Sequence, residues 1–120
     1  MLDLLESLVT LTNLKDGMIV VIKRCQWNKE LKIRVKNNER ILVQGSFTMA
    51  TKNCGVVKYD LTAAIQHLGG AEGGHYVAHL KDQNEFFTVN DNKPVCKMQP
   101  FELELSQIFI YTNSQSALEK

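Results

Sequence analysis

The stretch GGHYVAHLKDQNEFFTVND, Gly73 to Asp91, decides the fold of this chain. Two runs of alternating apolar side chains, 75–81 and 85–90, flank a short polar segment, which is the pattern of an antiparallel hairpin. A turn centred between Asp82 and Gln83 predicts three opposed pairs: His75 with Asn90, Val77 with Thr88, and His79 with Phe86. Asp-Gln lacks the glycine that two-residue turns favour, so a slip of this register stays open.

His75 and Asn90 are candidates for a catalytic pair. Directly opposed β-carbons lie about 4.5–5.5 Å apart, so a carboxamide at 90 can reach an imidazole at 75. An amide oxygen that accepts one ring N–H fixes the tautomer and leaves the other nitrogen as a base, as in Cys-His-Asn thiol hydrolases. Asp91 points to the opposite face of a regular strand and is the second candidate. The same pattern also fits an ordinary strand-end histidine beside a turn asparagine.

A metal site is the alternative use of His75 and His79, which are spaced H-x-x-x-H. The metalloprotease pattern needs a glutamate after the first histidine, where Tyr76 stands. On a strand, four residues span about 13 Å, too far for two rings to share an ion. We therefore expect no metal and no other cofactor.

The rest of the chain is mainly strand-like. Strands are expected at 18–25, 30–37, 40–47 and 108–112, an extended apolar segment at 56–70, a loop at 48–55, and a helical turn within 100–107. Leu2, Leu5, Leu8 and Val9 recur at helical spacing. These patterns predict an α+β fold, a mainly antiparallel sheet with a short N-terminal helix, as one domain over residues 1–120.

Composition excludes several classes of protein. The 120 residues are 44% hydrophobic and 22% charged, as in one soluble domain. A net charge of +1 provides no field for nucleic acid or a membrane surface, and no apolar run approaches the roughly 20 residues of a membrane span. The three cysteines are widely spaced without a Cys-x-x-Cys pair, which favours reduced thiols in an intracellular protein of the cytoplasm or nucleus.

The chain resembles the histidine-box half of a ubiquitin-specific protease (ubiquitin carboxyl-terminal hydrolase) catalytic domain. The matching residues are Tyr59, Leu61, Ala63, His67 and Gly69, then GHYVA at 74–78, Phe86-Phe87, Asn90-Asp91 and Val95. Lys23-Arg24 and QIFIYT resemble flanking strands of that domain. The resemblance covers about 18–112, and its core is 59–91.

The resemblance implies the palm-like part of a papain-like cysteine protease. It implies that His75 is the general base and that Asn90 is the third triad member, with Asp91 as its substitute. Gly73 and Gly74 would let the backbone pass close to a ubiquitin tail, although an ordinary loop hinge is the alternative. His67 and Tyr76 would belong to the cleft wall. Packing is the simpler role for Tyr76, and also for Trp27.

The nucleophile is the departure from this family. In the family, the catalytic cysteine lies in a sequence motif near the N-terminus of the domain, at the start of a helix. The sequence around Cys25, Cys54 or Cys96 does not match that motif. The first hypothesis is a deubiquitinating half-domain, inactive alone, that binds ubiquitin or a ubiquitinated protein. The second is an inactive ubiquitin-binding or protein-interaction module, a pseudoenzyme, and the third is a structural β-rich domain without a ubiquitin link. Exposed apolar surface is expected to bind a chain supplying the missing half, or to drive self-association.

Overall fold

The computed structural model describes residues 2–3, 17–51 and 55–114. The strands among them are β1 (Leu2–Asp3), β2 (Gly17–Val21), β3 (Cys25–Asn28), β4 (Ile33–Lys36), β5 (Ile41–Leu42), β6 (Ser46–Thr51), β7 (Gly55–Leu68), β8 (His75–Asp82), β9 (Glu85–Val89), β10 (Cys96–Lys97) and β11 (Ile108–Asn113). One helix, α1 (Phe101–Glu104), precedes β11.

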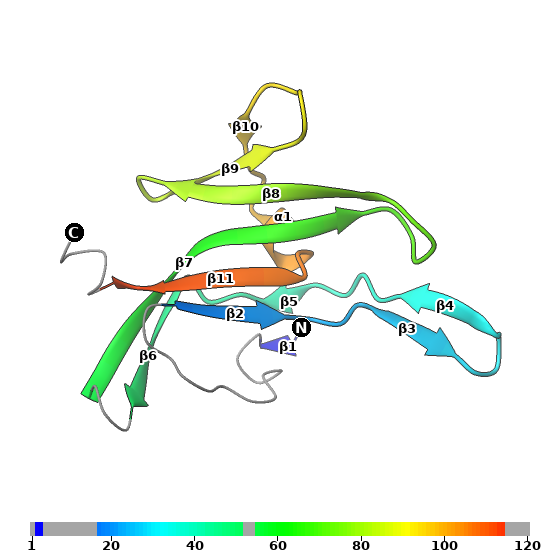
Figure 1. Ribbon diagram of the computed structural model, residues 1–120, viewed down its shortest axis with the longest axis horizontal. Helices are drawn as coiled ribbons and strands as arrows, with labels where there is room; N and C mark the ends of the chain where they lie inside the picture. The colour runs from blue at the N-terminus through cyan, green and yellow to red at the C-terminus, as the bar shows by residue number, and fades with distance from the viewer. Residues whose placement is uncertain (1, 4–16, 52–54, 115–120) are drawn as a thin grey trace.

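The main sheet has seven strands in the order β10-β9-β8-β7-β11-β2, with β6 paired to the first part of β7 (Figure 1). All its pairings are antiparallel. The β3–β4 hairpin and the parallel pair β1–β5 form two further sheets. The predicted fold class, a mainly antiparallel sheet with little helix, is confirmed.

A bulge in β7 changes which of its side chains are buried. The pairing with β11 jumps from Ala63–Ile110 to Leu61–Tyr111, so Thr62 is the extra residue of the ladder. The Thr62 hydroxyl donates to the Ile110 carbonyl at 3.2 Å. Buried positions of β7 are odd-numbered before the bulge and even-numbered after it. Both halves of this long strand thereby face the same core.

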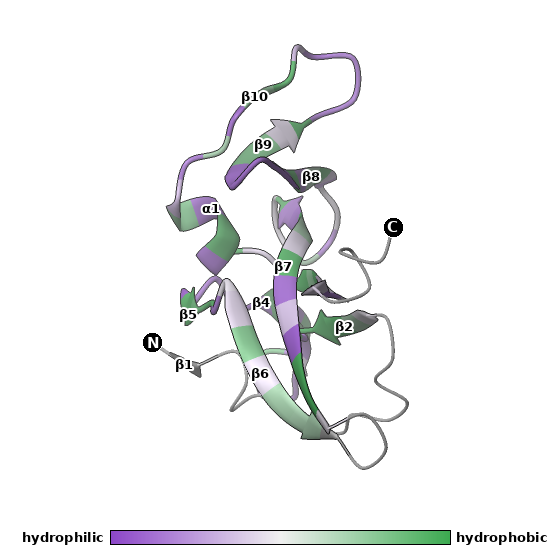
Figure 2. Cartoon of the chain, turned by 90° about the vertical axis from the view of Figure 1, so that its left-hand side faces the viewer, coloured by the Kyte–Doolittle hydropathy of each residue, from purple (hydrophilic) through white to green (hydrophobic). Residues whose placement is uncertain are grey.

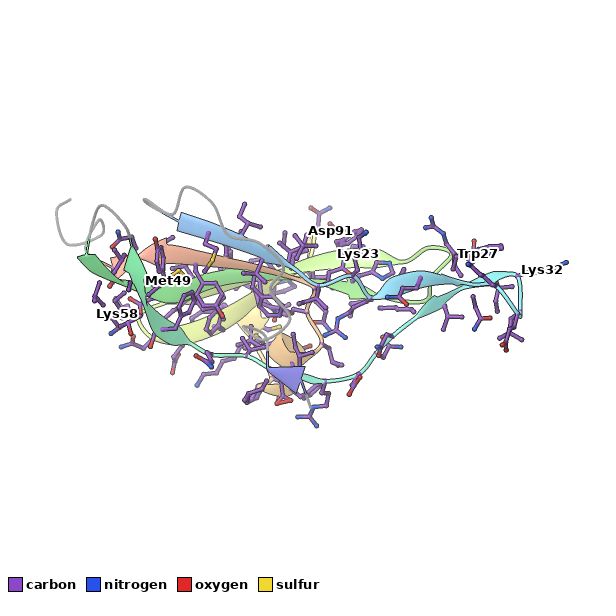
Figure 3. The ribbon with its side chains drawn as sticks, turned by 90° about the horizontal axis from the view of Figure 1, so that it is seen from below. Lys23, Trp27, Lys32, Met49, Lys58 and Asp91 are labelled. Carbon is purple, nitrogen blue, oxygen red and sulfur yellow. The ribbon has the colours of Figure 1, made fainter. Side chains whose placement is uncertain are left out.

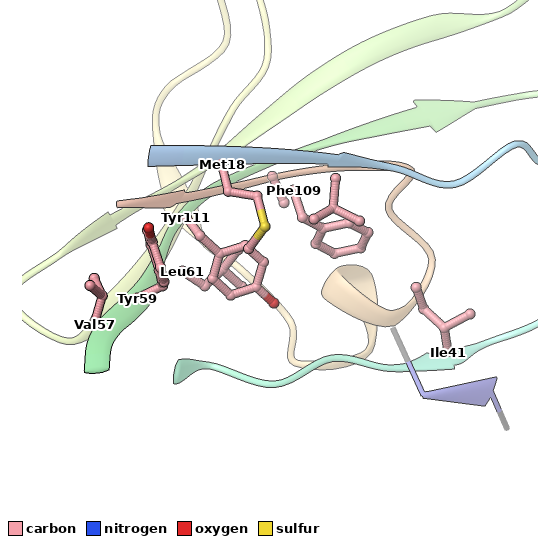
Figure 4. Close-up of a cluster of buried hydrophobic side chains, with 9 residues drawn as sticks. Met18, Ile41, Val57, Tyr59, Leu61, Phe109 and Tyr111 are labelled. Atoms are coloured by element: carbon pink, nitrogen blue, oxygen red, sulfur yellow. The ribbon is translucent and has the colours of Figure 1, made fainter. Parts of the chain in front are cut away.

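The core gathers on one face of the sheet (Figure 4). Its buried members are Met18, Val20, Ile41, Val57, Tyr59, Leu61, Ala64, Phe109 and Tyr111. The Phe47 ring packs against it, with its centroid 5.6 Å from that of Tyr59 and 5.0 Å from that of Tyr111. The Tyr111 hydroxyl donates to the Gln44 carbonyl at 2.7 Å, which satisfies its polar end.

The opposite face of the sheet carries exposed apolar side chains. Strand β2 is hydrophobic along its length (Figure 2). Its residues Ile19 and Val21 point away from the core and are 65% and 61% exposed. The strand registers place Ile19, Ile110, Ala63 and Leu80 in one row across β2, β11, β7 and β8. The exposed apolar surface expected from the sequence is present here.

Three local expectations need comment. The residues expected to form an N-terminal helix are largely outside the described ranges, and the two that are described, Leu2–Asp3, form a strand. The loop expected at 48–55 is wrong in part because Ser46–Thr51 is strand β6. Helix α1 falls within the predicted helical turn. No helix in the described ranges is long and apolar enough to cross a membrane.

Arg24 is a buried structural clamp, 4% exposed, in the segment between β2 and β3. Its guanidinium donates to the carbonyls of Ser106 (3.1 Å), Asn37 (3.1 Å), Glu39 (2.7 Å) and Glu104 (2.9 Å). Burial lowers the pKa of Arg24, and the Glu39 carboxylate opposes that shift. Arg24 therefore joins the segment after β4 to the end of α1.

We expect Arg24→Ala to lower the free energy of unfolding by about 3 kcal/mol, because buried carbonyls lose a charged donor. The exposed Arg34 provides the matched control, and Arg34→Ala should cost less than about 0.5 kcal/mol. Urea unfolding of both variants measures the difference. Equal midpoints for the two variants would show that the clamp has no structural role.

Candidate functional site

The candidate site lies on the β8–β9 hairpin, whose register differs by two residues from the predicted one. His79 pairs with Thr88 instead of Phe86, and the predicted opposed pairs are therefore wrong. The turn residues are Gln83 and Asn84, with φ of 50° and 70°. Positive φ at both positions defines the tight turn that suits a hairpin, and asparagine tolerates it. A shift of two residues keeps every side chain on its predicted face.

His75 and Asn90 meet on that shared face. They are now diagonal neighbours, and His75 Nε2 lies 2.5 Å from Asn90 Oδ1. With the amide oxygen as acceptor, Nε2 carries the proton and donates it, which leaves the Nδ1 lone pair free. The His75 side chain is 43% exposed, so part of the ring is open to solvent. The structure thus brings together the imidazole and the carboxamide that the sequence selected.

Asp91, the second candidate for the triad, also approaches His75. Its Oδ2 lies 3.5 Å from His75 Nε2. Strand β9 ends at Val89, and Asp91 has a left-handed φ of 47°, so strand alternation no longer sets its direction. The opposite direction was expected for a regular strand, and it does not apply here because β9 ends before Asp91. Its carboxylate is 75% exposed and can stabilise a positive charge on the ring, weakened by solvent.

The glycine loop before His75 is tightly fitted at Gly74 and open at Gly73. Gly74 has a φ of 147°, and a β-carbon there would overlap the Leu68 carbonyl and lie 2.5 Å from His67 Nε2. A β-carbon on Gly73 would meet nothing within 4 Å. Lys36 Nζ donates to the His67 carbonyl at 2.8 Å and to the Gly69 carbonyl at 2.9 Å. These contacts fix the backbone that leads into His75.

The four candidate substrate-binding residues line one pocket of about 580 Å³. They are His67, Gly73, Gly74 and Tyr76, and Cys25 and Arg34 face them from the β3–β4 side. The rings of His67 and Tyr76 contact each other at a centroid distance of 4.9 Å. Tyr76 is 58% exposed and Trp27 is 60% exposed. The expectation that both are packing residues is therefore wrong for Trp27, and for Tyr76 it is met only by the contact with the His67 ring.

Neither described cysteine pairs with His75. Cys25 is half-buried in the pocket wall, Cys96 is exposed in β10, and Cys54 lies outside the described residues. The polar contacts of the His75 ring among the described residues are Asn90 and Asp91. Residues 17–51 and 55–114 also hold no group of three or more His, Cys, Asp or Glu side chains placed to bind a metal ion.

His79 forms a buried polar network that sequence reasoning missed. Its ring is 0% exposed, with Nδ1 2.9 Å from Thr88 Oγ1 and Nε2 2.8 Å from Gln66 Oε1. The Gln66 oxygen accepts from Nε2–H and the Thr88 hydroxyl donates to Nδ1, so the ring is neutral. Burial lowers the pKa of His79, and the Glu102 carboxylate opposes the shift. This network joins β7, β8 and β9 at a point four residues along β8 from His75.

We expect the protein to lose stability in acid through His79. Because the folded-state pKa of His79 is lowered, the unfolded chain binds the extra proton as the pH falls below about 6.5. Stability is therefore flat above that pH and falls below it, until the folded state also protonates. A His79→Gln variant, which does not titrate, should lose this part of the slope. Urea midpoints between about pH 5 and 8 test it, and identical slopes would contradict it.

Comparisons with known proteins define first the fold and then the family. Among solved structures, a SAGA Ubp8/Sgf11/Sus1/Sgf73 DUB module bound to ubiquitin aldehyde matches with a TM-score of 0.67 and 20% identity, over 81% of this chain and 24% of that chain. Most of this chain thus has the fold of part of that structure.

The family is shown by sequence. The family model described as ubiquitin carboxyl-terminal hydrolase matches residues 9–111, and the chain belongs to this family. Ubiquitin carboxyl-terminal hydrolase A of Dictyostelium discoideum is 35% identical over 62% of the chain, and ubiquitin carboxyl-terminal hydrolase 47 of Drosophila melanogaster is 34% identical over 66%. The chain spans 9% and 5% of these two relatives. The resemblance noted from the sequence is confirmed.

Proposed function

We propose that this chain is the histidine-bearing part of a deubiquitinating thiol hydrolase domain, with residues 1–120 as one partial domain. His75 is the general base, Asn90 holds its tautomer, and Asp91 stabilises the imidazolium. The contact of 2.5 Å between His75 Nε2 and Asn90 Oδ1, in a member of the ubiquitin carboxyl-terminal hydrolase family, carries this proposal.

The proposed reaction is hydrolysis of the isopeptide bond at the C-terminal glycine of ubiquitin. Nδ1 of His75 takes the proton of a cysteine thiol, and the thiolate attacks the glycine carbonyl. The imidazolium then gives that proton to the departing lysine amine. Water, activated by the same nitrogen, attacks the thioester, the C–S bond breaks, and the carboxylate of ubiquitin and the cysteine thiol are released. The pocket formed by His67, Gly73, Gly74 and Tyr76 adjoins His75 in sequence and would receive the ubiquitin tail.

In this proposal the thiol comes from outside these 120 residues, and the chain alone is inactive. The outside origin of the thiol is supported by the two described cysteines, since neither Cys25 nor Cys96 contacts His75. The exposed row that includes Ile19 and Leu80 supports docking of the nucleophile-bearing part, since such a surface needs cover. The reduced-thiol pattern of the sequence favours an intracellular location, in the cytoplasm or nucleus.

Complementation tests the proposal. The chain is mixed with the cysteine-bearing N-terminal half of a catalytic domain of the same family, and cleavage of a fluorogenic ubiquitin C-terminal amide is followed. We expect activity from the mixture and none from either part. Full activity of the N-terminal half without this chain, or no activity after a stable complex forms, would contradict the hydrolase assignment.

A non-catalytic ubiquitin-binding module is the second candidate. The absence of a described cysteine beside His75 favours it. It predicts saturable shifts of the Gly73, Gly74 and Tyr76 amides when ubiquitin is titrated into the labelled chain by NMR, with no hydrolysis in any complemented mixture. Shifts accompanied by hydrolysis favour the first function, and the absence of both contradicts the two together.

A further inference from the structure

The β3–β4 hairpin projects away from the main sheet (Figure 1). Figure 3 shows Trp27 and Lys32 near its far end, away from the core. Its principal contacts are between its own two strands, and Lys36 ties its base to the loop after β7. The hairpin is therefore an arm that meets the rest of the described residues mainly at its base, where Cys25, Arg34 and Lys36 lie beside the loop between β7 and β8.

This arm exposes an unusual amount of apolar surface. Trp27, Leu31, Ile33 and Val35 are 60%, 63%, 50% and 41% exposed. A two-stranded hairpin is marginally stable in water without a third strand or a packed face. The register places Trp27 on the face of Arg34, and Ile33 and Val35 on the other face, so both faces of the ribbon carry apolar side chains that a partner would cover.

The charge of the arm defines the chemistry of that partner. Residues 25–36 contain four basic side chains and one acidic side chain, which gives +3, whereas the whole chain carries only +1. The remainder of the chain is therefore net acidic, and positive charge is concentrated on the arm. The basic side chains alternate with the apolar ones along β4, as in Ile33-Arg34-Val35-Lys36. A complementary surface has carboxylates between apolar side chains.

We infer that the β3–β4 arm docks an acidic, extended segment of another protein, which adds as a third strand along β4. The outer edge of β4 is available because its sheet has two strands among the described residues. The Asn37 amide donates to the Arg24 carbonyl at 2.5 Å, which makes Arg24 and Asn37 a hydrogen-bonded pair. Alternation along the antiparallel ladder then turns the backbone groups of Arg34 outward, toward an added strand.

A polypeptide fits this arm better than a nucleic acid does. Single-stranded nucleic acids bind on rows of aromatic side chains, whereas Leu31, Ile33 and Val35 are aliphatic and Trp27 is the one aromatic residue of the arm. The inference does not use the proposed chemistry at His75. Because Arg34 also lines the pocket assigned to the ubiquitin tail, its variant is scored on peptide binding and not on hydrolysis.

Trp27 provides a specific probe because it is the single tryptophan of the chain. The test titrates the whole chain with a synthetic peptide that alternates glutamate and valine over about twelve residues, up to about 1 mM, and follows Trp27 fluorescence. We expect a saturable blue shift of the Trp27 emission as the indole leaves water. Binding of the peptide should be weaker in roughly 0.5 M salt, because the salt screens the attraction between the charges. Lys32→Glu/Arg34→Glu should weaken binding at least about tenfold.

Two controls make the test specific. A matched lysine-valine peptide should not bind, and Lys58→Glu/Lys97→Glu, which reverses two exposed charges elsewhere, should leave the affinity for the acidic peptide unchanged. An unchanged Trp27 spectrum with the acidic peptide would overturn the inference. Equal binding of both peptides, or saturation by an oligothymidylate in place of the acidic peptide, would overturn it as well.

Discussion

Replacing His75 with alanine is expected to lower kcat of the complemented hydrolase by about 10³-fold or more. The imidazole is the group proposed to activate the thiol and to protonate the leaving amine, and its Nε2 is already held at 2.5 Å from Asn90 Oδ1. Loss of this ring leaves the thiol protonated and its attack slow. The KM for ubiquitin should change little, because the ring is proposed to act in the chemical step.

Asn90 supplies the internal comparison for this prediction. Asn90→Ala removes the acceptor that fixes the His75 tautomer, and we expect a smaller loss, about 10²-fold, because Asp91 remains near Nε2. Asn92→Ala, on the exposed turn beside it, is the matched control and should keep full activity. Steady-state kinetics on a fluorogenic ubiquitin substrate give these values. A loss below about tenfold for a folded His75→Ala variant would remove the imidazole from the mechanism.

Gly74→Ala is expected to have the largest effect on stability, about 3 kcal/mol or more. An added β-carbon meets the Leu68 carbonyl and the His67 ring, both held by neighbouring structure, at a φ that side chains rarely adopt. Part of this loss must come from the β7–β8 loop, since Lys36 holds the His67 and Gly69 carbonyls in place. Urea unfolding measures the total, and hydrogen exchange locates it.

Gly73→Ala is the matched control, because a β-carbon there meets no atom within 4 Å. This variant should unfold within about 0.5 kcal/mol of the original chain. If the two variants are equally stable, the loop adapts freely and the fit at Gly74 does not position His75. If both are strongly destabilised, the whole loop is constrained and the assigned difference between the glycines is wrong.

The pairing of His75 with Asn90 could be predicted because the face of a side chain survives an even error in register. The predicted turn at Asp82–Gln83 was wrong, and the observed turn at Gln83–Asn84 moves every pair by two residues. Asn84 was the available signal, because asparagine tolerates the positive φ that this turn requires. A register error of one residue would have placed His75 and Asn90 on opposite faces of the sheet.

Other features could not be read from local pattern. The bulge at Thr62 shifts the buried positions of β7 from odd-numbered to even-numbered residues. A prediction that assumes regular alternation therefore fails midway along that strand. His79 resembles any strand histidine until Gln66 and Thr88 arrive from neighbouring strands. The left-handed φ of Asp91 depends on where β9 ends, and strand ends are weakly encoded in sequence.

The most direct test of the account is a reaction between this chain and ubiquitin that carries a thiol-reactive C-terminal electrophile, followed by intact-mass spectrometry. We predict no adduct on the chain alone. With the complementary half, the adduct should form on the cysteine of that half, and His75→Ala should slow its formation sharply. An adduct on Cys25, Cys54 or Cys96 of the chain alone would contradict the claim that the histidine serves a thiol from outside these residues.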